Sequence, residues 1–283
     1  MPLASRTILG GLIRLVHPFP ILLDGIVVGA VAVVAGGDGM TALRLGVAMI
    51  ALQASIGSLN DLVDAPIDGG RTPAKPIPVG LVRPAWARAV VVGSAVLGFV
   101  LTAPSGGWLL ALAGLGLGIG YAYDLAAKGT AWSWVPFAIG IPLLPVFGWF
   151  GASRSLPAPF AIVIPVAVMA GAALAIANAS ADVAHDRATA RSSVAIRLGP
   201  ARAWAVVASL QVAVGAIAIG SLSATGRNLA AIVAAILAMA LVLIGVGLGR
   251  SRARLDLERA WEVQAIGVAL LGVSWLWGIA APG

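Results

Sequence analysis

The sequence predicts an all-α membrane protein in which nine transmembrane helices surround a central cavity. Three observations lead to this fold class: the apolar composition, the length of the apolar stretches and the placement of the basic residues. Hydrophobic residues make up 60% of the chain and charged residues 10%, whereas a soluble domain carries roughly 25% charged residues. Because the mean hydropathy is +1.01, we expect one transmembrane domain over residues 1–283, surrounded by membrane lipids.

The nine helices correspond to stretches long enough to cross a bilayer, whose apolar core of about 30 Å requires around 20 residues per helix. These stretches are expected near residues 18–36, 41–60, 85–103, 107–123, 132–151, 158–181, 201–222, 228–249 and 260–280. Since nine is an odd number, the two termini are expected on opposite sides of the membrane.

The basic residues predict the orientation of these helices. With a cytoplasmic N-terminus, 15 of the 18 Lys and Arg residues fall in cytoplasmic segments, and Arg44, Arg154 and Arg227 fall on the other side. This asymmetry is the positive-inside pattern, so we expect an integral protein of the cell membrane with the C-terminus outside. The pattern also explains the pI of about 11.2 without a nucleic-acid partner. The absence of cysteine excludes thiolate catalysis.

Two acidic motifs interrupt the apolar pattern at the cytoplasmic ends of the second and sixth expected helices. Both place Asn, Asp and Asp at i, i+4 and i+8, a spacing that directs side chains to one helix face. The first motif contains Asn60, Asp61, Asp64 and Asp68, and the second contains Asn178, Asp182 and Asp186. A single motif has an ordinary alternative, polar residues at a helix end. Because intramembrane acids are costly and usually functional, we interpret the two motifs as halves of one site.

An offset of 118 residues relates the motifs, and the same offset aligns Trp86 with Trp204. Both copies enter the membrane from the same side, which indicates a parallel internal repeat. Pro66 is expected to end the first helix near Asp64, because proline removes a backbone donor and clashes with the preceding turn. The second motif has no proline, so its three polar residues are expected to share a continuous helix face.

The residue types in the motifs favour Mg²⁺, which binds oxygen ligands and typically uses one or two carboxylates together with substrate phosphates. Basic residues follow both motifs and also occur in the loop between them. They are Arg71, Lys75, Lys128, Arg187, Arg191 and Arg197. A metal ion combined with Lys and Arg stabilises a diphosphate, although the positive-inside pattern alone also explains most of these charges.

Four further residues are candidates for lining the cavity. Gln53 lies two turns before Asn60 on the same helical face, where it would either line the cavity or bond to another helix. Asp24 lies early in the first span and is expected to contact an acceptor or to cap a loop. Tyr121 and Tyr123 are candidates for orienting a diphosphate or an acceptor.

The first motif, with the basic residues and Pro76 that follow it, resembles the first signature of the UbiA superfamily of intramembrane prenyltransferases. The second signature of that family is similar to Asp182 and Asp186 together with residues 194–199. The segment 123–128 is similar to the third cytoplasmic loop of the family, which carries Tyr and Lys. The resemblance covers nearly the whole chain and includes the nine-helix topology.

The resemblance implies a diphosphate bound through Mg²⁺ and assigns a role to each matching residue. The metal ligands would be Asp61, Asp64, Asp68, Asp182 and Asp186. The resemblance implies that Asn60 and Asn178 assist in binding and that Arg71, Lys75, Lys128 and Arg191 neutralise the leaving diphosphate. We count Lys128, Arg71, Arg191 and also Tyr123 as candidate catalytic residues, and Asn60, Lys75, Asn178 and also Gln53, Tyr121 and Arg197 as candidates for substrate binding. Two positions depart from the family pattern, because Lys75 often corresponds to Arg there and Asn178 to Asp.

These features predict a prenyltransferase that ionises an allylic isoprenyl diphosphate with Mg²⁺ and transfers the prenyl group to a small acceptor, releasing diphosphate. The acceptor would be an aromatic quinone precursor or another molecule of lipid pathways, and a homo-oligomer is compatible with the sequence. One alternative is a terpene cyclase of the same superfamily, in which the substrate itself captures the cation. A transporter of an anionic solute is disfavoured, because transporter sites lie near the membrane midplane.

Overall fold

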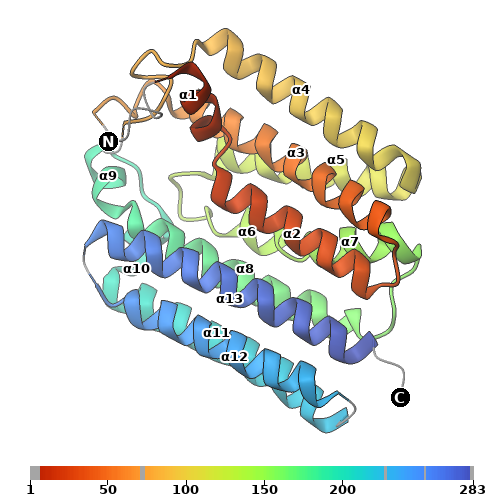
Figure 1. Cartoon of the computed structure of the whole chain (residues 1–283). Coiled ribbons are helices and arrows are strands. Elements are labelled where there is room, and N and C mark those ends of the chain that lie inside the picture. The colour runs from red at the N-terminus through yellow and green to blue at the C-terminus, as the bar shows by residue number, and fades with distance from the viewer. Residues whose placement is uncertain (1–6, 71–73, 226–227, 252, 281–283) are drawn as a thin grey trace.

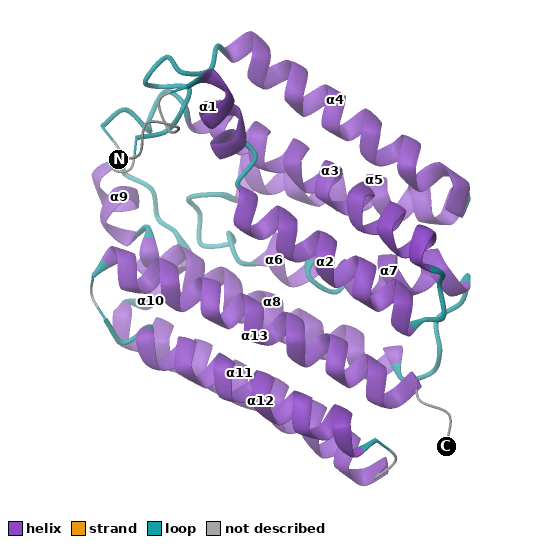
Figure 2. Cartoon of the chain, viewed as in Figure 1, coloured by secondary structure: helices purple, strands orange, loops and turns teal. Residues whose placement is uncertain are grey.

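A computed structural model describes residues 7–70, 74–225, 228–251 and 253–280, and all elements in these segments are helices or turns (Figure 1, Figure 2). The long helices are α2 (Pro18–Val34), α3 (Gly39–Asp64), α4 (Pro84–Thr102), α5 (Gly107–Ala122), α8 (Phe160–Ala181), α11 (Pro200–Thr225), α12 (Leu229–Leu248) and α13 (Arg254–Ala280). The shorter elements are α1 (Ile8–Leu15), η2 (Ala103–Ser105), η3 (Tyr123–Ala127), α6 (Val135–Gly140), α7 (Leu143–Ser153), α9 (Val183–Ala188) and α10 (Val194–Leu198). The structure thus has the predicted all-α fold class.

Eight helices or helix pairs in the described segments are long and apolar enough to cross a bilayer. The pair α1 and α2 becomes a ninth candidate if it counts as one span, because it is bent by 54°. The bend lies at His17, which has a left-handed backbone with φ 56°, directly before Pro18 at the start of α2. Figure 1 shows α1, α9 and the loop after α3 at one end of the bundle, opposite the end of α13.

Two expected helices differ from the structure in their extent. The stretch 132–151 forms two helices, α6 and α7, because Pro142 at their junction cannot donate a backbone hydrogen bond. The last helix begins at Arg254, six residues before the expected start at 260. An ion pair of 2.7 Å between Arg254 and Glu258, one turn apart, stabilises this polar extension.

The two motifs end their helices in different ways. As predicted, α3 ends at Asp64, just before Pro66. The prediction of a continuous helix through the second motif is wrong, because α8 ends at Ala181 and α9 starts at Val183. Near this break the Ser180 hydroxyl donates to the Ile176 carbonyl at 2.8 Å, a bond that bends helices. Asp182 therefore lies between two helices.

Close contact between α2 and α3 sets the position of the first motif. A Cβ at Gly46 would lie 2.8 Å from the Gly25 carbonyl oxygen, and a Cβ at Gly25 would lie 2.9 Å from the Gly46 oxygen. Real Cβ atoms do not approach backbone this closely, so both positions require glycine. Beside this crossing, Val28, Leu45 and Phe147 form a buried apolar core between α2, α3 and α7.

The α2 and α3 crossing predicts a stability difference between two glycines. Gly46→Ala is expected to lower stability by about 1–3 kcal/mol through overpacking. The control Gly93→Ala, in α4, has nothing within 4 Å of its added Cβ, so stability is expected to stay the same or rise slightly. Thermal unfolding of both variants in detergent measures the difference. Equal unfolding temperatures would contradict the close crossing.

Candidate active site

A cavity of about 580 Å³ lies between α2, α3, α5, α8 and α13. Residues of both motifs line its polar end, namely Asn60, Asn178 and Asp182. Lys75 and Lys128 line the same end, while side chains such as Met49 and Leu112 line the apolar walls. The cavity therefore combines a charged end with walls suited to a hydrocarbon.

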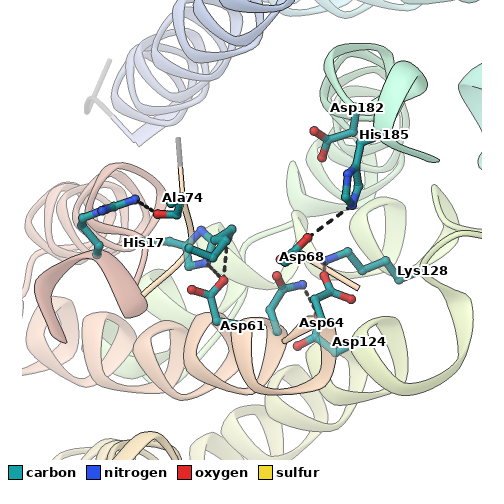
Figure 3. A network of polar contacts seen from close by, with 12 residues as sticks. His17, Asp61, Asp64, Asp68, Ala74, Asp124, Lys128, Asp182 and His185 are labelled. Carbon is teal, nitrogen blue, oxygen red and sulfur yellow. Dashed lines mark hydrogen bonds and ion pairs between the residues drawn. The ribbon is translucent and has the colours of Figure 1, made fainter. Parts of the chain in front are cut away.

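Asp61 is 2% exposed and lies behind Lys75, whose ammonium donates a hydrogen bond to its carboxylate. The His17 Nε2 atom lies 2.9 Å from the same carboxylate oxygen (Figure 3). The segment that carries Lys75 is anchored in turn, because the Arg14 guanidinium donates to the Ala74 carbonyl. The bend between α1 and α2 and the loop after α3 are thereby connected to the first motif.

Asp64 is 1% exposed and holds two basic side chains. The Lys128 ammonium donates to one carboxylate oxygen, and Arg191 Nη2 donates to the other at 2.6 Å. Lys128 follows η3, a π-helical turn of the kind often found at functional sites. Gly129 has φ 74°, and a Cβ there would lie 2.8 Å from the Arg191 side chain. Glycine at this position lets the two basic residues converge on Asp64.

Asp68 connects the two motifs across the site. Its Oδ1 atom lies 3.3 Å from His185 Nε2 in α9, as Figure 3 shows. Asp182 is more accessible, with a side chain that is 30% exposed and lies 3.8 Å from Arg254 Nη2. Asp186 is buried, at 7% exposure. Hence the structure brings all five predicted acids to one region.

Asp124 belongs to this polar network, although the sequence did not single it out as a site residue. The Asn60 amide donates to Asp124 Oδ1 at 2.6 Å, and Asp124 is 5% exposed. Its other carboxylate oxygen is buried and has no hydrogen-bond partner within the described segments. The only available signal was its place between Tyr123 and Lys128.

Some of the predicted site residues line the cavity and others do not. Gln53 and Tyr123 line it, and the Lys128 ammonium lies 6.0 Å from the centre of the Tyr123 ring. The Tyr121 hydroxyl instead lies 2.7 Å from the Ser55 hydroxyl, away from the cavity lining. Arg191 and Arg197 also fall outside the lining. Arg197 donates to the Ser192 hydroxyl at 3.3 Å, and Arg71 lies outside the described residues.

The first turns of α13 supply polar lining that the sequence analysis missed. Arg254, Glu258 and Glu262 face the cavity, together with Trp261. The signal for them was the spacing of Glu258 and Glu262, which places two acids one turn apart before an apolar helix. The opposite wall from the first motif is thus partly acidic.

The donor set fits a hard divalent cation in kind, because carboxylate oxygens dominate it. Asp61 Oδ2 is buried without a hydrogen-bond partner among the residues described, so it is available as a ligand. In the arrangement observed, no three acidic or imidazole side chains of the described segments converge as metal ligands. The reason is that Lys75, Lys128 and Arg191 neutralise the acids instead.

Solved structures with the same fold come from several proteins. A homologue of UbiA from Aeropyrum pernix is 20% identical, with a TM-score of 0.71 over 89% of this chain and 95% of that chain. A digeranylgeranylglyceryl phosphate synthase structure is 15% identical, with a TM-score of 0.69 over 96% and 98% of the two chains. A homologue from Archaeoglobus fulgidus, bound to GPP and Mg²⁺, is 18% identical, with a TM-score of 0.67 over 92% and 99%.

Comparison at the level of sequence gives the family. No curated protein sequence matches the chain. The profile of the UbiA prenyltransferase family, however, matches residues 23–280, which include both acidic motifs and all helices from α3 to α13. Because this match covers most of the chain, the protein belongs to the UbiA prenyltransferase family.

Proposed function

We propose that the protein transfers a prenyl group from an allylic isoprenyl diphosphate to a small-molecule acceptor within the membrane. The observation that carries the proposal is the pairing of Asp64 with Lys128 and Arg191, because Lys128 lines the polar end of a mostly apolar cavity. The polar end suits a diphosphate, because Lys and Arg make charge-assisted hydrogen bonds to phosphate oxygens. The apolar walls suit the prenyl chain.

Mg²⁺ is the metal ion in this proposal. Homologue structures from Archaeoglobus fulgidus contain GPP or DMAPP together with Mg²⁺, and the acids of this chain have the oxygen donors that Mg²⁺ requires. The residues that would hold it are Asp61, Asp64, Asp68, Asp182 and Asp186. When bound, it would supply positive charge at the leaving diphosphate.

The basic residues of this chain have two partners in the proposed reaction. Without substrate, Lys75 and Lys128 bind the carboxylates of Asp61 and Asp64. With substrate, their N–H groups would turn to the phosphate oxygens, where negative charge develops as the carbon to oxygen bond breaks. Asn60 and Asn178 line the same end and would orient the diphosphate. Aromatic walls, including Tyr123, would keep water from the allylic cation.

Transfer to a separate acceptor is favoured over cyclisation by the polar lining beyond the acidic motifs. Asp24 and Gln53 bond to each other in the wall of the cavity, where their polar atoms would bind a separate acceptor. In this proposal residues 1–283 form one domain of the cell membrane. The polar end and the N-terminus face the cytoplasm, the C-terminus faces outward, and the motifs derive from a parallel repeat.

Asp64 tests the proposal directly. Asp64→Asn is expected to reduce diphosphate release from an allylic diphosphate by at least about 100-fold, since it removes charge at the polar end. The matched control is Asp38→Asn, because Asp38 only caps α3 through Thr41 at 2.7 Å and Asn caps equally well. EDTA is expected to abolish release by the unmodified protein, and Mg²⁺ to restore it. Equal release by both variants would overturn the proposal.

Lys128 should have opposite effects on turnover and on metal binding. Lys128→Met is expected to slow diphosphate release by about 100-fold, because a cation near the leaving group is lost. The same change is expected to tighten binding of Mn²⁺ alone, since Lys128 no longer competes for Asp64. Release assays and electron paramagnetic resonance titration with Mn²⁺ measure both effects, with the exposed Arg88→Met as control. Unchanged release in Lys128→Met would contradict the role of Lys128.

A further inference from the structure

We infer that Asp24, held by Gln53, forms the acceptor end of the cavity and selects an uncharged ring that carries a hydroxyl group. The inference rests on the proposed prenyl transfer and adds the chemical class of the acceptor. It starts from a polar pair inside the membrane-spanning part of the bundle. Asp24 is in α2 and Gln53 in α3, and both line the cavity.

The contacts of Asp24 leave one oxygen for a ligand. Gln53 Nε2 donates to Asp24 Oδ2 at 2.6 Å. Within the described segments Gln53 is the one hydrogen-bond partner of Asp24, so Oδ1 has none from the protein. Both side chains are partly exposed, and the surface that they expose faces the cavity. The pair therefore offers a free hydrogen-bond acceptor to a ligand in the cavity, in addition to joining two helices.

A structural role in joining α2 to α3 does not explain an acid at this position. Those helices already pack through the backbones of Gly25 and Gly46, and apolar side chains would join them without desolvating a carboxyl group. Intramembrane acids are expensive and usually serve function. Asp124, by comparison, lies among the charges of the polar end and receives its hydrogen bond from Asn60.

The distance from the acidic motifs suits a small ring. Gln53 precedes Asn60 by seven residues, which is about 10 Å along a helix. Ile56 and Gly57 lie between these positions along the cavity wall. A ring held at Asp24 by one substituent would thus extend toward the diphosphate end, where the allylic cation forms.

Aromatic side chains surround this end of the cavity. Phe19 and Trp261 pack edge to face with ring centres 5.5 Å apart, and Phe137 packs in the same way on Tyr123 at 5.4 Å. Phe19, Trp261 and Phe137 line the main cavity and also an adjoining apolar cavity of about 150 Å³ that reaches Asp24. Offset and edge contacts of this kind bind a flat ring well.

Charge decides which substituent the ring carries. An ionised carboxyl group accepts hydrogen bonds but donates none, so in its ionised form Asp24 matches a hydroxyl group and repels a carboxylate. Glu262 adds negative charge on the facing wall of α13, where Arg254 neutralises Glu258. The aromatic walls and the acids together therefore favour a hydroxylated, uncharged ring over an aromatic acid.

Two probes that differ in one group test the inference. The protein in nanodiscs is given geranyl diphosphate, Mg²⁺ and either 4-hydroxybenzyl alcohol or 4-hydroxybenzoate, and prenylated product is measured by mass spectrometry. The expected KM for the alcohol is at least about tenfold below that for the carboxylate, as loss of one hydrogen bond and added repulsion would give. Asp24→Asn is expected to raise the KM for the alcohol about tenfold and to remove the preference.

Diphosphate release without an acceptor separates this inference from the proposed function. The unmodified protein and the control Asp38→Asn are expected to release diphosphate at the same rate, and an unchanged thermal unfolding temperature shows that Asp24→Asn is folded. Release with no preference between the probes, with neither probe prenylated, or with an unchanged KM in Asp24→Asn overturns the acceptor inference alone. Absence of release from the unmodified protein overturns the prenyl transfer itself.

Discussion

The burial of carboxylates at one end of an apolar bundle is the constraint on which the site depends. Asp61, Asp64 and Asp68 are each 1% or 2% exposed, and a buried charge without a partner destabilises a protein by about 3–5 kcal/mol. Their partners come from separate parts of the chain, in the order His17, Lys75, Lys128, His185 and Arg191. The bend before α2, the loop after α3, the end of η3 and α9 are therefore drawn to the end of α3. Electrostatic neutralisation acts on these irregular segments together with apolar packing, such as the buried cluster of Leu15, Ile77 and Val82.

The long helices form a rigid wall around the open cavity. Gly25 and Gly46 bring α2 and α3 into backbone contact, and Gly171 does the same for α8, where a Cβ would lie 2.5 Å from the Phe137 carbonyl oxygen. Tight crossings of this kind hold the walls without filling the space between them. The cavity then has a charged end and mostly apolar walls elsewhere, because α3 carries its acidic residues only near its end. One helix thus provides both a wall and half of the charged site.

The sequence predicted the fold class and the clustering of the acids, because both follow from composition and from spacing along the chain. The end of α3 near Asp64 followed from Pro66, whose covalent structure acts locally. The break at Asp182 was missed, since no proline or glycine marks it and it depends on how α8 and α9 pack. The position of Tyr121 also could not be predicted from the sequence. Its position two residues from Tyr123 gave no sign that it bonds to Ser55 rather than facing the cavity. Which acid pairs with which base is a property of three-dimensional packing, so pairs such as Asp64 with Arg191, 127 residues apart, were beyond prediction.

Under the proposed function, the ion pairs also couple metal binding to substrate binding. Lys75 and Lys128 occupy the carboxylates that the metal ion would use, so a metal ion binding alone must displace both lysines from their carboxylate partners. A diphosphate provides such partners, because it offers the lysines new acceptors at the same end of the cavity. Each ligand therefore lowers the free-energy cost of binding the other, and by linkage the effect is mutual. The apolar cavity then admits the metal and the diphosphate together, and the charges that stabilise the empty site become those that stabilise the leaving group.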